Sequence, residues 1–230
     1  MPKIEFHISD DLKDVVPHPI SAVKSVPDWY RKMPHYNRPI EGPEIETLKK
    51  CVPFRDMLTS GYIIPNWCGI RLEKVDGEIK SHPLNDELKS LNCGVSFHSI
   101  EQIVNTPLEK LADKGKMLKI NSPWVIKTPK GYSTLFLSPQ YRDNEIEILP
   151  AIVDTDVFYT PVNFPAVMIK NKCWLEQGVP LVQVIPFKRE SWTSSVHSWS
   201  YEKARKQTIQ LMSRISSYYS DEHWIRKIFR

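Results

Sequence analysis

Alternating apolar and polar positions run through the middle of the chain and predict a series of short strands. The pair Asp76-Gly77 separates two such runs and is the strongest local signal for a β-hairpin. The runs recur about every 8–12 residues, without the helical crossovers that parallel strands need. We therefore expect antiparallel strands at residues 62–65, 68–74, 78–81, 118–121, 124–128, 132–137, 146–149, 162–164, 166–169 and 181–187.

The hydrophobic period changes near the C-terminus, where apolar residues recur every three or four positions. This spacing predicts an amphipathic helix over residues 201–218, with Ser200 as its cap and a second helical segment from Ser220. Short helices are also expected at 26–34, 53–59 and 107–114, each with a proline near its start. The chain contains 19 Pro and only 8 Gly, so long central strands and long helices are both disfavoured.

These elements predict a mainly β fold with a jelly-roll or β-clip-like antiparallel core, short peripheral helices and a C-terminal amphipathic helix. We expect a single domain, with a Pro-rich wrapping arm (1–60), a β core (61–190) and a helical appendage (198–230). Pro186 should confine the strand at 181–187 to a strand end or a sheet edge. An edge needs a cover, which the C-terminal helix or formation of a homo-oligomer would supply.

Charge gives only weak information about partners. The chain carries a net charge of +4, and residues 188–230 contain nine basic and four acidic side chains. We interpret this tail as a solvated helix face, because no cluster is dense enough for a nucleic-acid footprint. The C-terminal residues Trp192, Trp199 and Trp224 are interpreted as packing groups, not as base-stacking ones.

Cysteine usage and hydropathy point to a cytosolic chain. The four cysteines form no Cys-x-x-Cys motif, so reduced, buried cysteines are expected. No apolar run approaches the ~18 residues of a membrane span, and the start of the chain lacks the apolar region of a signal peptide. A membrane partner is therefore not expected.

The segment Ile146–Tyr159, followed by Gly178-Val-Pro-Leu-Val-Gln183, resembles the central part of the trimeric dUTPase and dCTP deaminase β-fold. The resemblance implies a nucleotide site in which Asp154 matches the water-activating carboxylate, with Asp156 beside it. It places Phe158 near the substrate-stacking Tyr, displaced by one position, and Gln183 at a structural strand position. Tyr159 is a further candidate binding residue, and Mg²⁺ would accompany the nucleotide. The family's serine motif has no counterpart at Ser138, and residues 188–230 contain no glycine for a phosphate-closing arm. We favour the alternative that the aspartates bond within their own turn.

Histidines give no metal-ligand pattern. The seven are scattered, with no His-x-His and no His-x-Asp/Glu pair, so no metal site is predicted. The compact trio of His98, Glu101 and Gln102 is a candidate binding group, although a hydrogen-bonded surface turn is the preferred interpretation. A metal-dependent oxygenase of the jelly-roll type is therefore the third functional hypothesis.

A broader resemblance covers most of residues 20–190. It is carried by Val26-Pro-Asp-Trp-Tyr30, Gly61-Tyr-Ile-Ile-Pro65, Asn121-Ser-Pro-Trp124, Gly131-Tyr-Ser-Thr-Leu-Phe136, Val162-Asn-Phe-Pro165 and Val184-Ile-Pro-Phe-Lys-Arg189. These phrases resemble an uncharacterised protein family of marine T4-like cyanophages. The resemblance implies a viral setting and no mechanism. Our first functional hypothesis is therefore a phage-type accessory or structural protein that acts by binding and assembly, and the second is the nucleotide enzyme.

Overall fold

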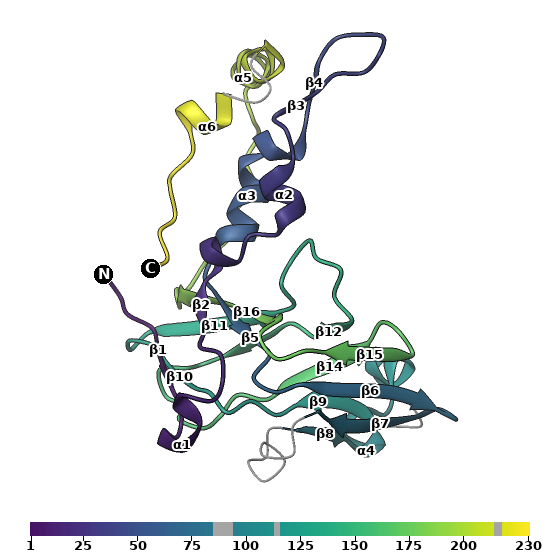
Figure 1. Cartoon of the computed structure of the whole chain (residues 1–230). Helices are drawn as coiled ribbons and strands as arrows, with labels where there is room; N and C mark the ends of the chain where they lie inside the picture. The colour runs from purple at the N-terminus through teal and green to yellow at the C-terminus, as the bar shows by residue number, and fades with distance from the viewer. Residues whose placement is uncertain (85–93, 113–115, 214–217) are drawn as a thin grey trace.

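The structure, a computed structural model, describes residues 1–84, 94–112, 116–213 and 218–230 (Figure 1). It is mainly β, with several antiparallel sheets and short helices, as the sequence predicts, and is compatible with a jelly-roll or β-clip-like class. The strands are β1 (Glu5–His7), β2 (Ile20–Ser21), β3 (Tyr36–Asn37), β4 (Ile45–Glu46), β5 (Tyr62–Pro65), β6 (Ile70–Val75), β7 (Glu78–Pro83), β8 (Val95–His98), β9 (Met117–Ile120), β10 (Val125–Lys127), β11 (Tyr132–Leu137), β12 (Ile146–Ile148), β13 (Ala151–Val153), β14 (Phe164–Met168), β15 (Lys172–Leu175) and β16 (Pro180–Lys188).

The helical elements are short, with one exception at the C-terminus. They are α1 (Asp10–Lys13), η1 (Ala22–Ser25), α2 (Asp28–Lys32), η2 (Leu48–Lys50), α3 (Val52–Thr59), α4 (Ile100–Ile103), η4 (Pro107–Leu111), α5 (Tyr201–Ser213) and α6 (Tyr218–Glu222). None of the helices in the described part of the chain is long and apolar enough to span a membrane.

The largest sheet has the strand order β13-β11-β16-β5-β2, so β16 lies at its centre. Of the two alternatives expected from Pro186, a strand end or a sheet edge, the sheet edge is therefore wrong. The structure shows how the proline fits: β5 pairs with β16 only as far as Tyr62 opposite Val184. At Pro186 the strand has β11 on one side, with Thr134 as partner. Pro186 thus lies beyond the end of β5, so β5 needs no backbone N–H from this position of β16.

Two further sheets, β12-β14-β9-β8 and β15-β6-β7, share one hydrophobic core with the largest sheet. This core contains Trp67, Leu72, Phe136, Phe164 and Val182, each at most 2% exposed. They come from four strands and the loop after β5, so burial of their apolar surface holds the sheets together. The hairpin between β6 and β7 is confirmed at the predicted Asp76-Gly77, where both residues have positive φ.

A projecting unit, formed by α2, η2, α3 and the β3–β4 hairpin, rises from one edge of the sheets (Figure 1). Within the Pro-rich segment 1–60, β1 and β2 pair with β10 and β5, Leu12 of α1 lies in the hydrophobic core, and the projecting unit follows. Aromatic rings fix the projection to the loop after β11, where Phe54 stacks on Tyr141 at 3.8 Å between ring centroids. In the same contact Trp29 Nε1 donates to the Tyr141 carbonyl oxygen at 3.0 Å.

Several local expectations need correction. Residues 107–111 form a 3-10 helix rather than the predicted longer helix, and its expected end at Gly115 lies outside the described residues. The predicted strands at 162–164 and 166–169 are one strand, β14, and β1, β8, β13 and β15 were not predicted. Cys51 is exposed, Cys68 and Cys173 are buried as expected, and Cys93 lies outside the described residues.

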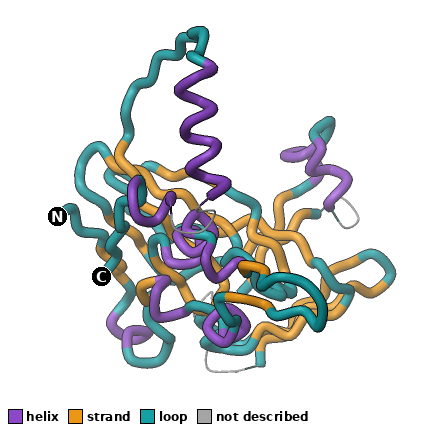
Figure 2. The backbone as a smooth tube through the Cα atoms, turned by 90° about the horizontal axis from the view of Figure 1, so that it is seen from above, coloured by secondary structure: helices purple, strands orange, loops and turns teal. Residues whose placement is uncertain are grey.

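The C-terminal helix forms where the pattern predicts, since α5 begins at Tyr201 with the Ala204 N–H bonded to the Ser200 carbonyl oxygen. The end of the predicted helix at 214–217 is outside the described residues. The helix does not cover a sheet edge. Figure 2 shows it at the end of an extended loop, away from the sheets. The predicted second helical segment is α6, and residues 224–230 continue without regular structure.

Candidate functional site

The acidic turn at residues 154–156 lies at one end of the largest sheet because β11 pairs with strands on both sides. Thr134 pairs with Val153 of β13, and Tyr132 pairs with Lys188 of β16. The residues that follow these two partners, Asp154 and Arg189, therefore leave the sheet at the same end. The register of β11 brings together groups that are more than thirty positions apart in sequence.

Arg189 binds both aspartates of the turn. Its Nη1 lies 2.8 Å from Asp156 Oδ1 and 3.1 Å from Asp154 Oδ1, and its Nη2 donates to Asp156 Oδ2. The Gly131 N–H also donates to Asp156 Oδ2, at 2.8 Å, and the Ser133 hydroxyl donates to Asp154 Oδ1 at 2.6 Å. Both oxygens of Asp156 are thus engaged by groups of this chain in a bidentate pair.

The two carboxylates differ in exposure and in electrostatics. The Asp156 side chain is 2% exposed, whereas that of Asp154 is 58% exposed. The hydrogen bonds from Arg189 and from the Gly131 N–H lower the pKa of Asp156 from 3.8 to about 2. The hydrogen bond between Arg189 and Asp156 also raises the pKa of Arg189. At neutral pH the turn therefore holds a paired, ionised Asp156, with Asp154 at the surface.

Hydrogen bonds between threonine hydroxyl groups fix the acidic turn to the sheet. Thr155, which is fully buried, lies 2.8 Å from the hydroxyl oxygens of both Thr128 and Thr134. The Tyr159 hydroxyl donates to the carbonyl oxygen of Asp156 at 2.7 Å, and its ring remains 59% exposed. Through these contacts the acidic turn connects the end of β13 to β11 and to the end of β16. Sequence reasoning identified the turn but missed Arg189, Ser133 and the threonines.

Gln183 lies at the centre of β16, away from the acidic turn, and is 1% exposed. Its Nε2 donates to the carbonyl oxygens of Met57 and Ser60, at 2.8 and 2.9 Å, and its Oε1 accepts from the Gln140 N–H at 3.3 Å. The side chain therefore connects the C-terminal end of α3 to the sheet.

His98 and Gln102 lie in another sheet and its following helix, so the six predicted site residues do not converge. His98 Nδ1 is 3.2 Å from Gln102 Oε1, and Gln102 and Ser99 form a capping box at the start of α4. This geometry is that of a hydrogen-bonded surface turn. Among the residues that the structure describes, no group of three or more His, Cys, Asp or Glu is placed to hold a metal ion.

Two open cavities are lined in part by residues of β1. One open cavity of about 790 Å³ is lined by His7, Ser9, Asn121 and Asn163, among others. A second, of about 580 Å³, lies against Trp124. None of Asp154, Asp156, His98, Gln102, Tyr159 and Gln183 lines either cavity.

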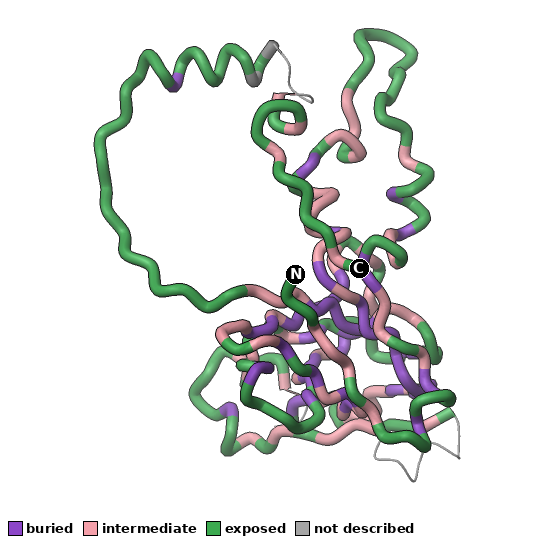
Figure 3. The backbone as a smooth tube through the Cα atoms, turned by 90° about the vertical axis from the view of Figure 1, so that its left-hand side faces the viewer, coloured by how far each residue is buried: buried purple, intermediate pink, exposed green. Residues whose placement is uncertain are grey.

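The most unusual surface is the C-terminal arm, which we define as residues 189–213. From residue 188 to residue 203 every residue is exposed. The exposed fractions are 85% for Trp192, 68% for Trp199 and 77% for Tyr201, and Met212 on α5 is 70% exposed. Figure 3 shows the arm leaving the sheets as one long exposed segment before the chain returns. The expectation that Trp192 and Trp199 pack the appended helix onto the sheet is therefore wrong.

Comparison with known proteins assigns no family to this chain. No protein-family model matches it, and no curated protein matches it.

Proposed function

We propose that this chain is a binding and assembly protein that forms homo-oligomers through its C-terminal arm. The phage-type resemblance of residues 20–190 supports an accessory or structural role in a viral setting, in the host cytoplasm or in the virion. The contacts of Arg189 with Asp154 and Asp156 support a structural role for the acidic turn.

The observation that carries this proposal is the exposure of large aromatic side chains along the arm. Single exposed apolar residues are ordinary on protein surfaces, but a continuous set marks an interaction surface. Trp192, Trp199 and Tyr201 lie within ten positions of one another, and each is at least two-thirds exposed. Tyr and Trp are also the residue types that are enriched in protein interfaces.

The area that these side chains offer approaches the area of a stable dimer interface. An aromatic side chain buries roughly 150–250 Å². The three rings from each of two copies therefore supply on the order of 1,000 Å², close to the ~1,200 Å² at which stable interfaces begin. Ile209 and Met212 of α5, which are 55% and 70% exposed, extend the same apolar surface.

Light scattering coupled to size-exclusion chromatography tests the proposal across micromolar concentrations. We expect the full chain to form dimers or larger oligomers, and the double variant Trp192→Ser/Trp199→Ser to elute as a monomer with an unchanged circular dichroism spectrum. The matched control is Trp174→Ser, because Trp174 is 53% exposed on β15 of the body. A monomeric full chain, or oligomers that persist in the double variant, would contradict the proposal.

A further inference from the structure

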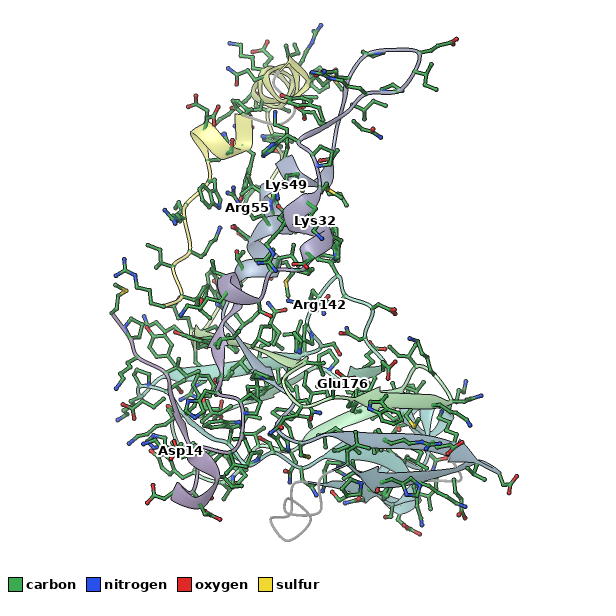
Figure 4. All side chains as sticks on the ribbon, in the orientation of Figure 1. Asp14, Lys32, Lys49, Arg55, Arg142 and Glu176 are labelled. Atoms are coloured by element: carbon green, nitrogen blue, oxygen red, sulfur yellow. The ribbon has the colours of Figure 1, made fainter. Side chains whose placement is uncertain are left out.

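The C-terminal tail, residues 224–230, returns to the body of the protein and binds α3 of the projecting unit. Trp224 Nε1 donates to both carboxylate oxygens of Asp56, at 3.1 and 3.0 Å, and Lys227 Nζ donates to Asp56 Oδ2 at 2.6 Å. The guanidinium group of Arg55 lies 4.4 Å from the centroid of the Trp224 ring. Figure 4 shows Arg55 on the side of α3 that faces the tail.

The end of the tail makes a second set of contacts, with β2 and β5. Ser21 Oγ donates to the Phe229 carbonyl oxygen at 2.7 Å, and the Tyr62 hydroxyl donates to that of Arg230 at 3.1 Å. The Phe229 ring lies edge-on to the Tyr62 ring, with 6.2 Å between centroids. Ser21 and Tyr62 are direct partners in the sheet register, so this receiving surface is rigid. The tail therefore has a preformed site with an acidic end at Asp56 and an aromatic end at Tyr62.

The chain between β16 and the tail is long enough to reach a neighbouring molecule. Residues 189–200 span about 40 Å when extended, and the thirteen residues of α5 add about 20 Å. A compact domain of this size has a diameter of about 40 Å. When the tail binds its own body, the aromatic side chains of the arm are exposed. When two chains exchange tails, their arms run side by side and these side chains can be buried.

We propose that the tail site on α3, β2 and β5 of one copy binds residues 224–230 of a second copy, so that two chains form a dimer by exchanging tails. The contacts of Asp56, Arg55 and Tyr62 are the same in either case, because only the chain that supplies the tail changes. Exchange of an identical element is a low-cost route to dimers. Tail exchange rests on the proposed function, since burial of the arm supplies the free energy that favours the dimer over the closed monomer.

Charge reversal at the Asp56–Lys227 pair tests exchange by complementation between chains. The variants Asp56→Lys and Lys227→Asp each place like charges at the tail site. The like charges weaken the tail contact equally in the closed monomer and in the exchanged dimer, so we expect each variant alone to dimerise no more strongly than the wild type. In an equimolar mixture every exchanged tail that crosses between the two variants meets an opposite charge. The mixture should therefore dimerise at about tenfold or more lower concentration than either variant alone, and its dimers are identified as heterodimers by a mass tag on one chain. The double variant Asp56→Lys/Lys227→Asp should dimerise as the wild type does.

A mixture that dimerises no better than its separate components would overturn tail exchange. That result would leave assembly through the arm intact if the separate variants still dimerise. A wild-type chain that stays monomeric would overturn the proposed function as well. As a second readout that does not depend on charge reversal, a chain with Asp56→Cys is mixed with a chain with Lys227→Cys, both carrying Cys51→Ser. Exchange predicts a disulfide-linked heterodimer on a non-reducing gel, and its absence would contradict exchange.

Discussion

Replacement of Gln183 by leucine should lower the free energy of unfolding strongly, although the side chain is buried and the protein surface stays the same. Gln183→Leu keeps a side chain of similar volume in the centre of β16 and removes the amide. Three backbone groups then lose their partner: the carbonyl oxygens of Met57 and Ser60, and the N–H of Gln140. A buried polar group left unpaired costs about 1–3 kcal/mol.

The expected magnitude follows from the partial burial of these three backbone groups. Because water can reach part of each, we expect about 1 kcal/mol per group and a loss of about 2–4 kcal/mol in the free energy of unfolding. For a chain of this size that loss lowers the melting temperature by roughly 5–15 °C. Urea unfolding followed by tryptophan fluorescence and by circular dichroism measures it. The matched control is Gln207→Leu on the exposed face of α5, where the change should stay within about 0.5 kcal/mol. Equal effects of the two substitutions would refute the structural role of Gln183.

Two further predictions concern the acidic turn and a close backbone contact. The pKa of Asp156 is lower in the folded protein (about 2) than its ordinary value of 3.8, so its stabilising contribution is complete above about pH 4 and is lost as the pH falls toward 2. Urea midpoints at several pH values should therefore fall less steeply over this window in Asp156→Asn than in the wild type, and parallel curves would contradict the pairing with Arg189. Gly61 has φ of +75°, and a Cβ there would lie 2.0 Å from the Val184 carbonyl oxygen, so Gly61→Ala should cost more than about 2 kcal/mol in thermal or urea unfolding. Gly131→Ala, with φ of +85° and open space around it, is the control and should cost only about 1 kcal/mol; equal losses would show that the close approach at Gly61 is relieved.

The sequence predicts the local elements of this fold well because their signals are local. Asp76-Gly77 accepts the positive φ of a tight hairpin turn, and the hairpin is where the pattern places it. The helix at α3 likewise begins beside Pro53, as predicted, and ends before Gly61. Strand order is a non-local property, and the sequence left open whether Pro186 marks a strand end or a sheet edge. Nothing in the residues around Pro186 shows that β5 pairs with one part of β16 and ends before the proline.

The same distinction applies to the candidate site residues. A turn containing Asp154 and Asp156 could be recognised, but its partner Arg189 lies beyond a different strand and reaches the turn only through the register of β11. The one available signal was a lone arginine directly after an apolar strand. For α5 the period predicted an amphipathic helix, but amphipathicity shows only that an apolar face needs a partner. The partner expected within this chain was the edge of a sheet, but in the structure Ile209 and Met212 of α5 are more than half exposed.

Hydrogen–deuterium exchange measured as a function of protein concentration tests most directly whether the arm joins copies of this chain. The account predicts that amides within residues 189–213 become protected as the concentration rises through the dimerisation range, while the exchange of β11 and β16 stays constant. An arm that exchanges at the same fast rate at every concentration would contradict the account.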